Sequence, residues 1–160
     1  MYKRQSVDFN ADNGSDGSSK SIGLDYAPMD GMMVFYGTSD IAAGTNDTDS
    51  HTTFGGTYTT GGATVGLQMT SIDDATANSD IDRTHIAASF AVNENLSVSY
   101  GMSTVEFEAA SKTDQEDSGF GASYTMGSMT FGASLLASDN VGGTSGTDDT
   151  HKEISVAFAF

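Results

Sequence analysis

The chain has 160 residues, the length of a single domain, and its 22 acidic and 6 basic side chains give a net charge of −16. This charge argues against a nucleic-acid partner and favours cations as counter-charges. Cysteine is absent, which excludes disulfides and thiolate metal sites, and 19 glycines with only 1 proline indicate β-structure with many turns.

Ten segments alternate between apolar and small or polar residues, which is the period of a β-strand. In chain order they are residues 2–10, 21–29, 32–40, 52–60, 63–71, 83–92, 96–107, 118–126, 129–138 and 151–160. Short connections suited to hairpins ("DG", "GG", "NEN" and "GS") alternate with long polar ones such as "DIAAGTNDTDSH". The sequence therefore predicts an all-β, antiparallel up-and-down sheet with every tight turn at one end.

The two faces of these segments differ in chemistry. In residues 96–107, one face carries Leu96, Val98, Tyr100 and Met102, and the other carries Ser97, Ser99, Gly101 and Ser103. A soluble sheet would place Lys and Glu on its outer face, whereas most acids of this chain lie in the long connections. Basic residues are expected to be missing from the middle of the apolar face because each would cost about 2–4 kcal/mol at a bilayer midplane. The pattern favours a transmembrane β-barrel with a hydrated interior. No apolar run reaches the roughly 18 residues of a transmembrane helix.

The last segment, "HKEISVAFAF", places Ile154, Val156, Phe158 and Phe160 on one face and ends on an aromatic residue. This ending resembles the assembly signal of bacterial outer-membrane β-barrels. With the rhythm of loops and turns, residues 1–160 resemble the C-terminal part of a Gram-negative general porin of the alphaproteobacterial type. The resemblance implies one porin β-barrel domain in the outer membrane, passive diffusion of small hydrophilic solutes and ions, and homotrimers of barrels of about sixteen strands. The first ten residues show no signal-peptide pattern, and we expect a fragment that lacks about six strands and the loop that narrows the pore.

Charged residues on the polar face are the candidates for lining the pore. Arg83 and His85 share a face with Ala87, and Asp25 lies between the oppositely directed Leu24 and Tyr26. The resemblance implies basic and acidic residues facing each other across a pore. The predicted lining residues are Arg4, Asp8, Asp25, Arg83, His85 and Glu153. The alternative for Arg83 is an ion pair with Asp82 or Glu153 near the rim.

The acidic loops and the histidines raise two further interpretations, a calcium site and a catalytic site. The acidic loops "DNGSDG", "TNDTDS" and "TDDT" lack the full calcium-loop pattern, so no cofactor is expected and a loop-bound Ca²⁺ is the alternative. His51, His85 and His151 each follow nearby acids, but no enzyme family is matched and no catalysis is expected. The expected partners are outer-membrane lipid, lipopolysaccharide, solutes and cations.

Two non-channel alternatives remain. One is a closed ten-stranded barrel that acts as an adhesin or structural protein, and the other is a secreted soluble β-protein. A small closed barrel needs bulky or paired charged side chains inside, whereas the inward positions here are mostly Gly, Ser, Thr and Ala. This composition favours membership of a larger barrel.

Overall fold

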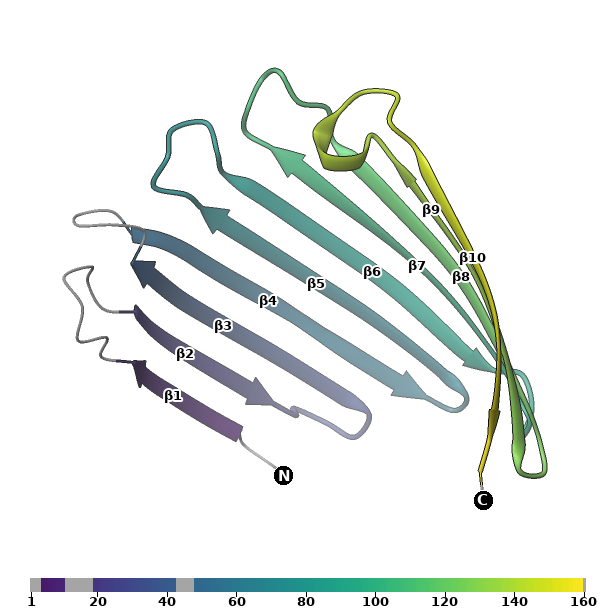
Figure 1. The fold of residues 1–160 in the computed structure, drawn as a ribbon. Helices are drawn as coiled ribbons and strands as arrows, with labels where there is room; N and C mark the ends of the chain where they lie inside the picture. The colour runs from purple at the N-terminus through teal and green to yellow at the C-terminus, as the bar shows by residue number, and fades with distance from the viewer. Residues whose placement is uncertain (1–3, 11–18, 43–47, 160) are drawn as a thin grey trace.

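A computed structural model describes residues 4–10, 19–42 and 48–159 of the chain. In this part of the chain, ten strands form one sheet in which each strand pairs antiparallel with the next. Figure 1 shows a single curved layer, with β1 and β10 at its two edges. The strands are β1 (Arg4–Asn10), β2 (Ser19–Tyr26), β3 (Met32–Ala42), β4 (Thr48–Thr60), β5 (Ala63–Asp73), β6 (Ile81–Ala91), β7 (Leu96–Phe107), β8 (Gln115–Met126), β9 (Met129–Asp139) and β10 (Asp149–Phe158). The predicted up-and-down topology is confirmed.

The connections β2–β3, β4–β5, β6–β7 and β8–β9 lie at one end of the sheet, and the longest described connections, β5–β6, β7–β8 and β9–β10, lie at the other (Figure 1). We call the end with the short hairpins the tight-turn end and the other the long-loop end. Several strands extend further toward the long-loop end than predicted: β4 starts at Thr48 instead of Thr52, and β8 starts at Gln115 instead of Ser118. The ladder continues there because backbone groups pair whatever the side chains are, so polar Thr, Asp and Gln positions remain in the strands.

Two of the tight turns accept backbone hydrogen bonds from the strand that comes next in the chain after their hairpin. The carbonyl oxygen of Gly31 accepts a hydrogen bond from the Thr59 amide at 2.7 Å, and that of Gly62 accepts one from Ala91 at 2.7 Å. Gly31 has a φ of 77°, in the left-handed region, and a Cβ on it would collide with the Thr59 carbonyl oxygen. Glycine is therefore required at this position for two separate reasons.

Replacing Gly31 with alanine should lower the free energy of unfolding by more than the roughly 1–2 kcal/mol cost of a left-handed non-glycine residue, because the collision adds to that cost. Gly61 is the matched control, since it has a φ of 55° but no neighbouring atom within 4 Å of an added Cβ. Urea unfolding of the refolded protein, followed by far-ultraviolet circular dichroism, measures both losses. Equal losses for Gly31→Ala and Gly61→Ala would show that the collision is relieved at no cost.

The sheet has no conventional hydrophobic core in the residues that the structure describes. Val105 is the one apolar side chain classed as buried there, with 9% of its surface exposed. No helix in these ranges is long and apolar enough to cross a membrane. A single layer leaves both faces of the sheet uncovered by the chain itself, so the chemistry of each face indicates its surroundings.

Candidate functional site

One face of the sheet is built from small and hydroxyl-bearing residues. Residues directly opposite each other in an antiparallel ladder share a face, so the strand register defines rows that cross the sheet. One row on this polar face contains Glu153, Ser134, Gly121, Ser99, Ser89 and Thr64. The adjacent row contains Ser155, Gly132, Ser123, Ser97 and Ala91. These two rows line much of a hollow of about 590 Å³, and we call the face that bears it the concave face.

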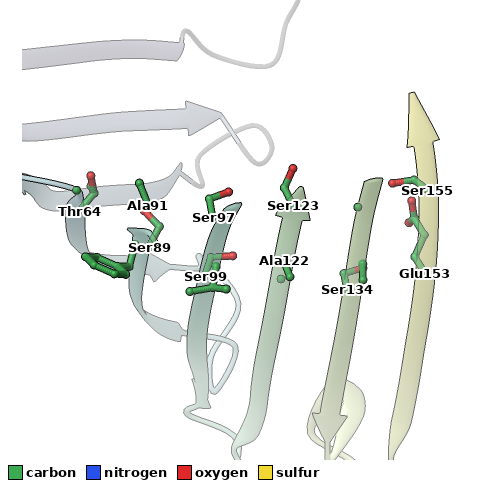
Figure 2. A pocket seen from close by; sticks show the side chains of 16 residues that line it. Thr64, Ser89, Ala91, Ser97, Ser99, Ala122, Ser123, Ser134, Glu153 and Ser155 are labelled. Atoms are coloured by element: carbon green, nitrogen blue, oxygen red, sulfur yellow. The ribbon is translucent and has the colours of Figure 1, made fainter. Parts of the chain in front are cut away.

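Figure 2 shows how the side chains of this hollow lie. Glu153 and Ser155 project from β10 toward the neighbouring strands, and the hydroxyl groups of Ser97 and Ser123 stand clear of their strands. The hollow is wide because most of its lining residues are Gly, Ala or Ser, whose side chains are absent or small. Such a surface offers hydroxyl groups to water and leaves room for solute.

Threonine pairs connect neighbouring strands on the polar face. The hydroxyl oxygens of Thr53 and Thr70 lie 3.1 Å apart, and those of Thr125 and Thr130 also lie 3.1 Å apart. Both pairs are direct cross-strand partners in the register. Hydrogen bonds of this kind stabilise strand pairing by a few tenths of a kcal/mol, up to about 1 kcal/mol each, without filling the space above the sheet.

The register brings the sequence-predicted residues of the described chain onto this polar face. Asp25 and His85 lie in one row, which also contains Asp117 and Asp149. Arg83 lies in the next row toward the long-loop end, opposite Thr70 and Val105. The side chains of Arg83, His85, Asp25 and Glu153 are exposed. In β1, Arg4 pairs with Asp25 and Asp8 with Ser21, but the Arg4 and Asp8 side chains lie outside the described part of the structure.

The charged groups on the polar face make one ion-pair contact among the described residues. The His151 Nε2 and a Glu153 carboxylate oxygen lie 3.8 Å apart and form an ion pair when the imidazole is protonated. Arg83 has no carboxylate of the described residues within ion-pair distance. Asp82 neighbours it in β6 and so points to the other face, while Glu153 lies four strands away. The alternative of a pair between Arg83 and either acid is therefore wrong for this structure.

The histidines and acids do not gather into a metal site in the part of the chain that the structure describes, where no group of three or more such ligands is found. Two of the predicted acidic loops fall partly or wholly in residues 11–18 and 43–47, outside the described ranges. The Ca²⁺ alternative therefore stays a prediction. His51, His85 and His151 lie on three different strands, β4, β6 and β10.

The opposite face is apolar and uncovered. One row across it contains Leu135, Phe120, Tyr100, Ala88, Val65 and Tyr58. Tyr100 is 50% exposed and Phe120 49% exposed, because the chain supplies no second layer. Ile154, Val156 and Phe158 continue this face on β10 and are exposed as well, whereas Phe160 lies outside the described residues. An apolar surface that crosses many strands requires an apolar environment or a partner.

Lys152 is a basic residue on the apolar face, toward the long-loop end of β10 and outside the middle of the face, where the sequence predicts no basic residue. It pairs with Leu135 and therefore stands in the same row as Phe120 and Tyr100. Lys152 is the fourth residue of β10, close to the long-loop end. A lysine in this place can bury its aliphatic stem along apolar neighbours and direct its ammonium group toward the aqueous end.

Sequence reasoning missed a cluster on the polar face at the long-loop end. The Gln115 side-chain amide donates to the Asp117 carboxylate at 2.9 Å, and the Lys112 ammonium lies 4.4 Å from the centre of the Phe107 ring. The one signal in the sequence is that Lys112 is the only Lys or Arg between Arg83 and Lys152. That signal marks the residue but not its contacts, which join loops far apart in the chain.

A one-layer meander with a concave hydroxyl-rich face and an exposed apolar face is the wall of a membrane β-barrel. Residues 2–130 match the model of the Gram-negative porin family, and the chain belongs to that family. The fold is similar to that of a solved mutant of Rh. blastica porin, with a TM-score of 0.65, 16% sequence identity, and coverage of 92% of this chain and 47% of that one. The chain therefore spans about half the length of that porin. No curated protein matches the chain. The predicted family and fold class are confirmed.

Proposed function

We propose that the chain forms part of the wall of a water-filled channel through which small hydrophilic solutes and ions diffuse passively. The observation that carries this proposal is the opposite chemistry of the two faces of one meander sheet. The apolar face suits lipid contact, and the concave face offers hydroxyl groups, glycines and a few separated charges to water. Nothing in this arrangement calls for a chemical step, and we propose no catalysis.

The pore-lining role is proposed for the residues that the register places on the concave face, Asp25, Arg83, His85 and Glu153, and for Arg4 and Asp8 from the sequence. The described ones lie on three strands, β2, β6 and β10. This placement supports a diffusion pathway over a binding site, because a binding site needs several groups that converge on one ligand. Each charge would instead bias the ions that pass near it.

Family membership supports three further proposals: an outer-membrane location in a Gram-negative bacterium, a homotrimer of the full-length protein, and contact with lipid and lipopolysaccharide. Ile154, Val156, Phe158 and Phe160 are proposed as an assembly signal. The exposed apolar placement of the first three on β10 supports this proposal.

The channel is tested by reconstituting the intact protein that contains this segment into planar bilayers and liposomes. We expect discrete steps of conductance, and swelling of liposomes in small sugars that slows as the sugar becomes larger. A protein that is folded by circular dichroism and inserted into the membrane, yet passes neither ions nor sugars, would overturn the proposal. That outcome would favour the closed-barrel adhesin instead.

The adhesin alternative has less support from the structure. A closed barrel of ten strands would need large or paired charged side chains to fill its interior. Along the central row of the concave face, Gly119, Gly101, Ala87, Gly66 and Thr57 instead stand between Leu136 and Met33. This run of small residues would leave the middle of such a barrel unfilled, and no pairing between β1 and β10 occurs in the described sheet.

A further inference from the structure

The connection between β9 and β10, residues 140–148, lies against the polar face of the sheet. It contains the short 3-10 turn η1 (Val141–Gly143), and Gly143 is buried. A Cβ built on Gly143 would lie 3.0 Å from Cε2 of Phe107 and 2.8 Å from Cδ of Lys112. Phe107 belongs to the polar face, two residues beyond Val105, the partner of Arg83. The turn therefore covers the concave side of β7 at the long-loop end.

Two connections that are distant in sequence are joined at this point. The Lys112 ammonium, from the β7–β8 connection, donates to the Gly142 carbonyl oxygen at 2.8 Å while it lies over the Phe107 ring. The Gly142 amide donates to the Gln115 side-chain oxygen at 2.8 Å. The Thr113 amide donates to the Gly143 carbonyl oxygen at 3.1 Å. Each of the two connections thus donates hydrogen bonds to the other segment, through backbone and side-chain groups.

The β9–β10 connection is also ordered within itself. Asn140 adopts a left-handed conformation, with a φ of 56°. Its side chain donates to the Asp114 carbonyl oxygen at 3.1 Å and accepts from the Gly146 amide at 3.0 Å. The Val141 amide donates to the Thr147 carbonyl oxygen at 2.7 Å. Many of its polar groups bond internally or to the β7–β8 connection and Gln115 of β8. We therefore expect the connection to keep one shape in solution.

We propose that these connections form a fixed shelf, defined as residues 112–115 and 140–143, that narrows the mouth of the channel at the long-loop end. The shelf adds to the hindrance that hydrophilic solutes meet at this mouth, and Lys112 is the residue that holds it in place. This inference rests on the proposed channel function. It assigns Lys112 a positioning role, because its ammonium is used by the Gly142 carbonyl and the Phe107 ring.

Lys112→Met tests the shelf because methionine keeps an unbranched side chain over Phe107 but cannot donate to Gly142. Lys152→Met is the matched control, since it removes the same charge from the opposite face. In the intact protein we expect Lys112→Met to raise single-channel conductance and the uptake of a trisaccharide relative to a monosaccharide in liposome swelling. Lys152→Met should leave both unchanged. Asn140→Gly, which keeps the left-handed backbone and removes the bonds to Asp114 and Gly146, should act in the same direction as Lys112→Met.

Amide hydrogen exchange of residues 140–148 in the refolded protein provides a readout that needs no channel. Protection should be present in the native protein and lost in Lys112→Met. If the native protein conducts and Lys112→Met keeps both the native conductance and the native ratio of trisaccharide to monosaccharide uptake, the shelf proposal is overturned, whether or not protection changes. If the native protein does not conduct, the channel proposal fails and the shelf proposal fails with it, while the exchange data still show whether Lys112 orders the connection.

Discussion

Arginine in place of Ile86 is expected to prevent stable insertion of the folded sheet into a bilayer, whereas arginine in place of the adjacent Ala87 is expected to be tolerated. Ile86 lies at the centre of β6 on the apolar face, opposite Leu67 and Met102, and is 50% exposed. A basic side chain facing lipid at mid-depth costs about 2–4 kcal/mol. Ala87 faces the concave side, opposite Gly66 and Gly101, where an arginine has room and water.

Urea titrations of folding into lipid vesicles measure this difference, and Val98→Arg with Ser99→Arg repeats the test on β7. Equal costs within both pairs would contradict the assignment of the two faces. A water-soluble sheet would also be damaged by Ile86→Arg, so the folded protein must be shown to require detergent or lipid. Folding in plain buffer would contradict the membrane proposal independently of the mutations.

The second large effect is on ion selectivity: a channel that contains this segment should favour cations over anions at low salt. The chain carries 22 acids and 6 bases, and the long connections place many of the acids at one mouth. A field of one sign concentrates the opposite ion near the mouth. Because the Debye length falls from about 10 Å at 0.1 M salt to about 3 Å at 1 M, the preference should weaken as salt rises.

Reversal potentials across a planar bilayer under a salt gradient measure the selectivity. Glu153→Gln removes a charge from the concave face and should reduce cation preference. The control Glu106→Gln removes the same charge from the apolar face, where Glu106 lies opposite Asp82 in the strand register. It should reduce the cation preference less than Glu153→Gln does. Anion preference in 0.1 M salt, or an equal response to both substitutions, would contradict the prediction.

The strands and turns were accessible from the sequence because they depend on local patterns. Alternation places Val98 and Ser99 on opposite faces, and glycine in "DG" and "GG" supplies the positive φ that tight hairpins need. The polar ends of β4 and β8 were missed because side-chain alternation fades there while backbone pairing continues.

The residues of the candidate site were only partly predictable. Faces follow from period alone, so Asp25, Arg83, His85 and Glu153 could be placed on one side of the sheet. Contacts between loops depend on the three-dimensional course of each connection. No spacing in the sequence predicts that Lys112 donates a hydrogen bond to Gly142, which lies 30 residues later. Lys152 follows the same period onto the apolar face, and its place toward the long-loop end agrees with the rule that no basic residue stands in the middle of that face.

The strict pairing of each strand with its sequence neighbours has a consequence for how this sheet assembles. Each pair of adjacent strands closes only a short loop of chain. The conformational entropy lost in forming one hairpin therefore does not depend on whether the other hairpins have formed. Growth of the sheet then behaves as a nearly one-dimensional process, in which any hairpin can nucleate and the next strand adds to a preformed edge. The hydrogen bonds from the Thr59 amide to the Gly31 carbonyl oxygen and from the Ala91 amide to the Gly62 carbonyl oxygen couple these two hairpins to the strand that follows each. Damage at one hairpin should therefore stop growth locally and leave distant hairpins able to form.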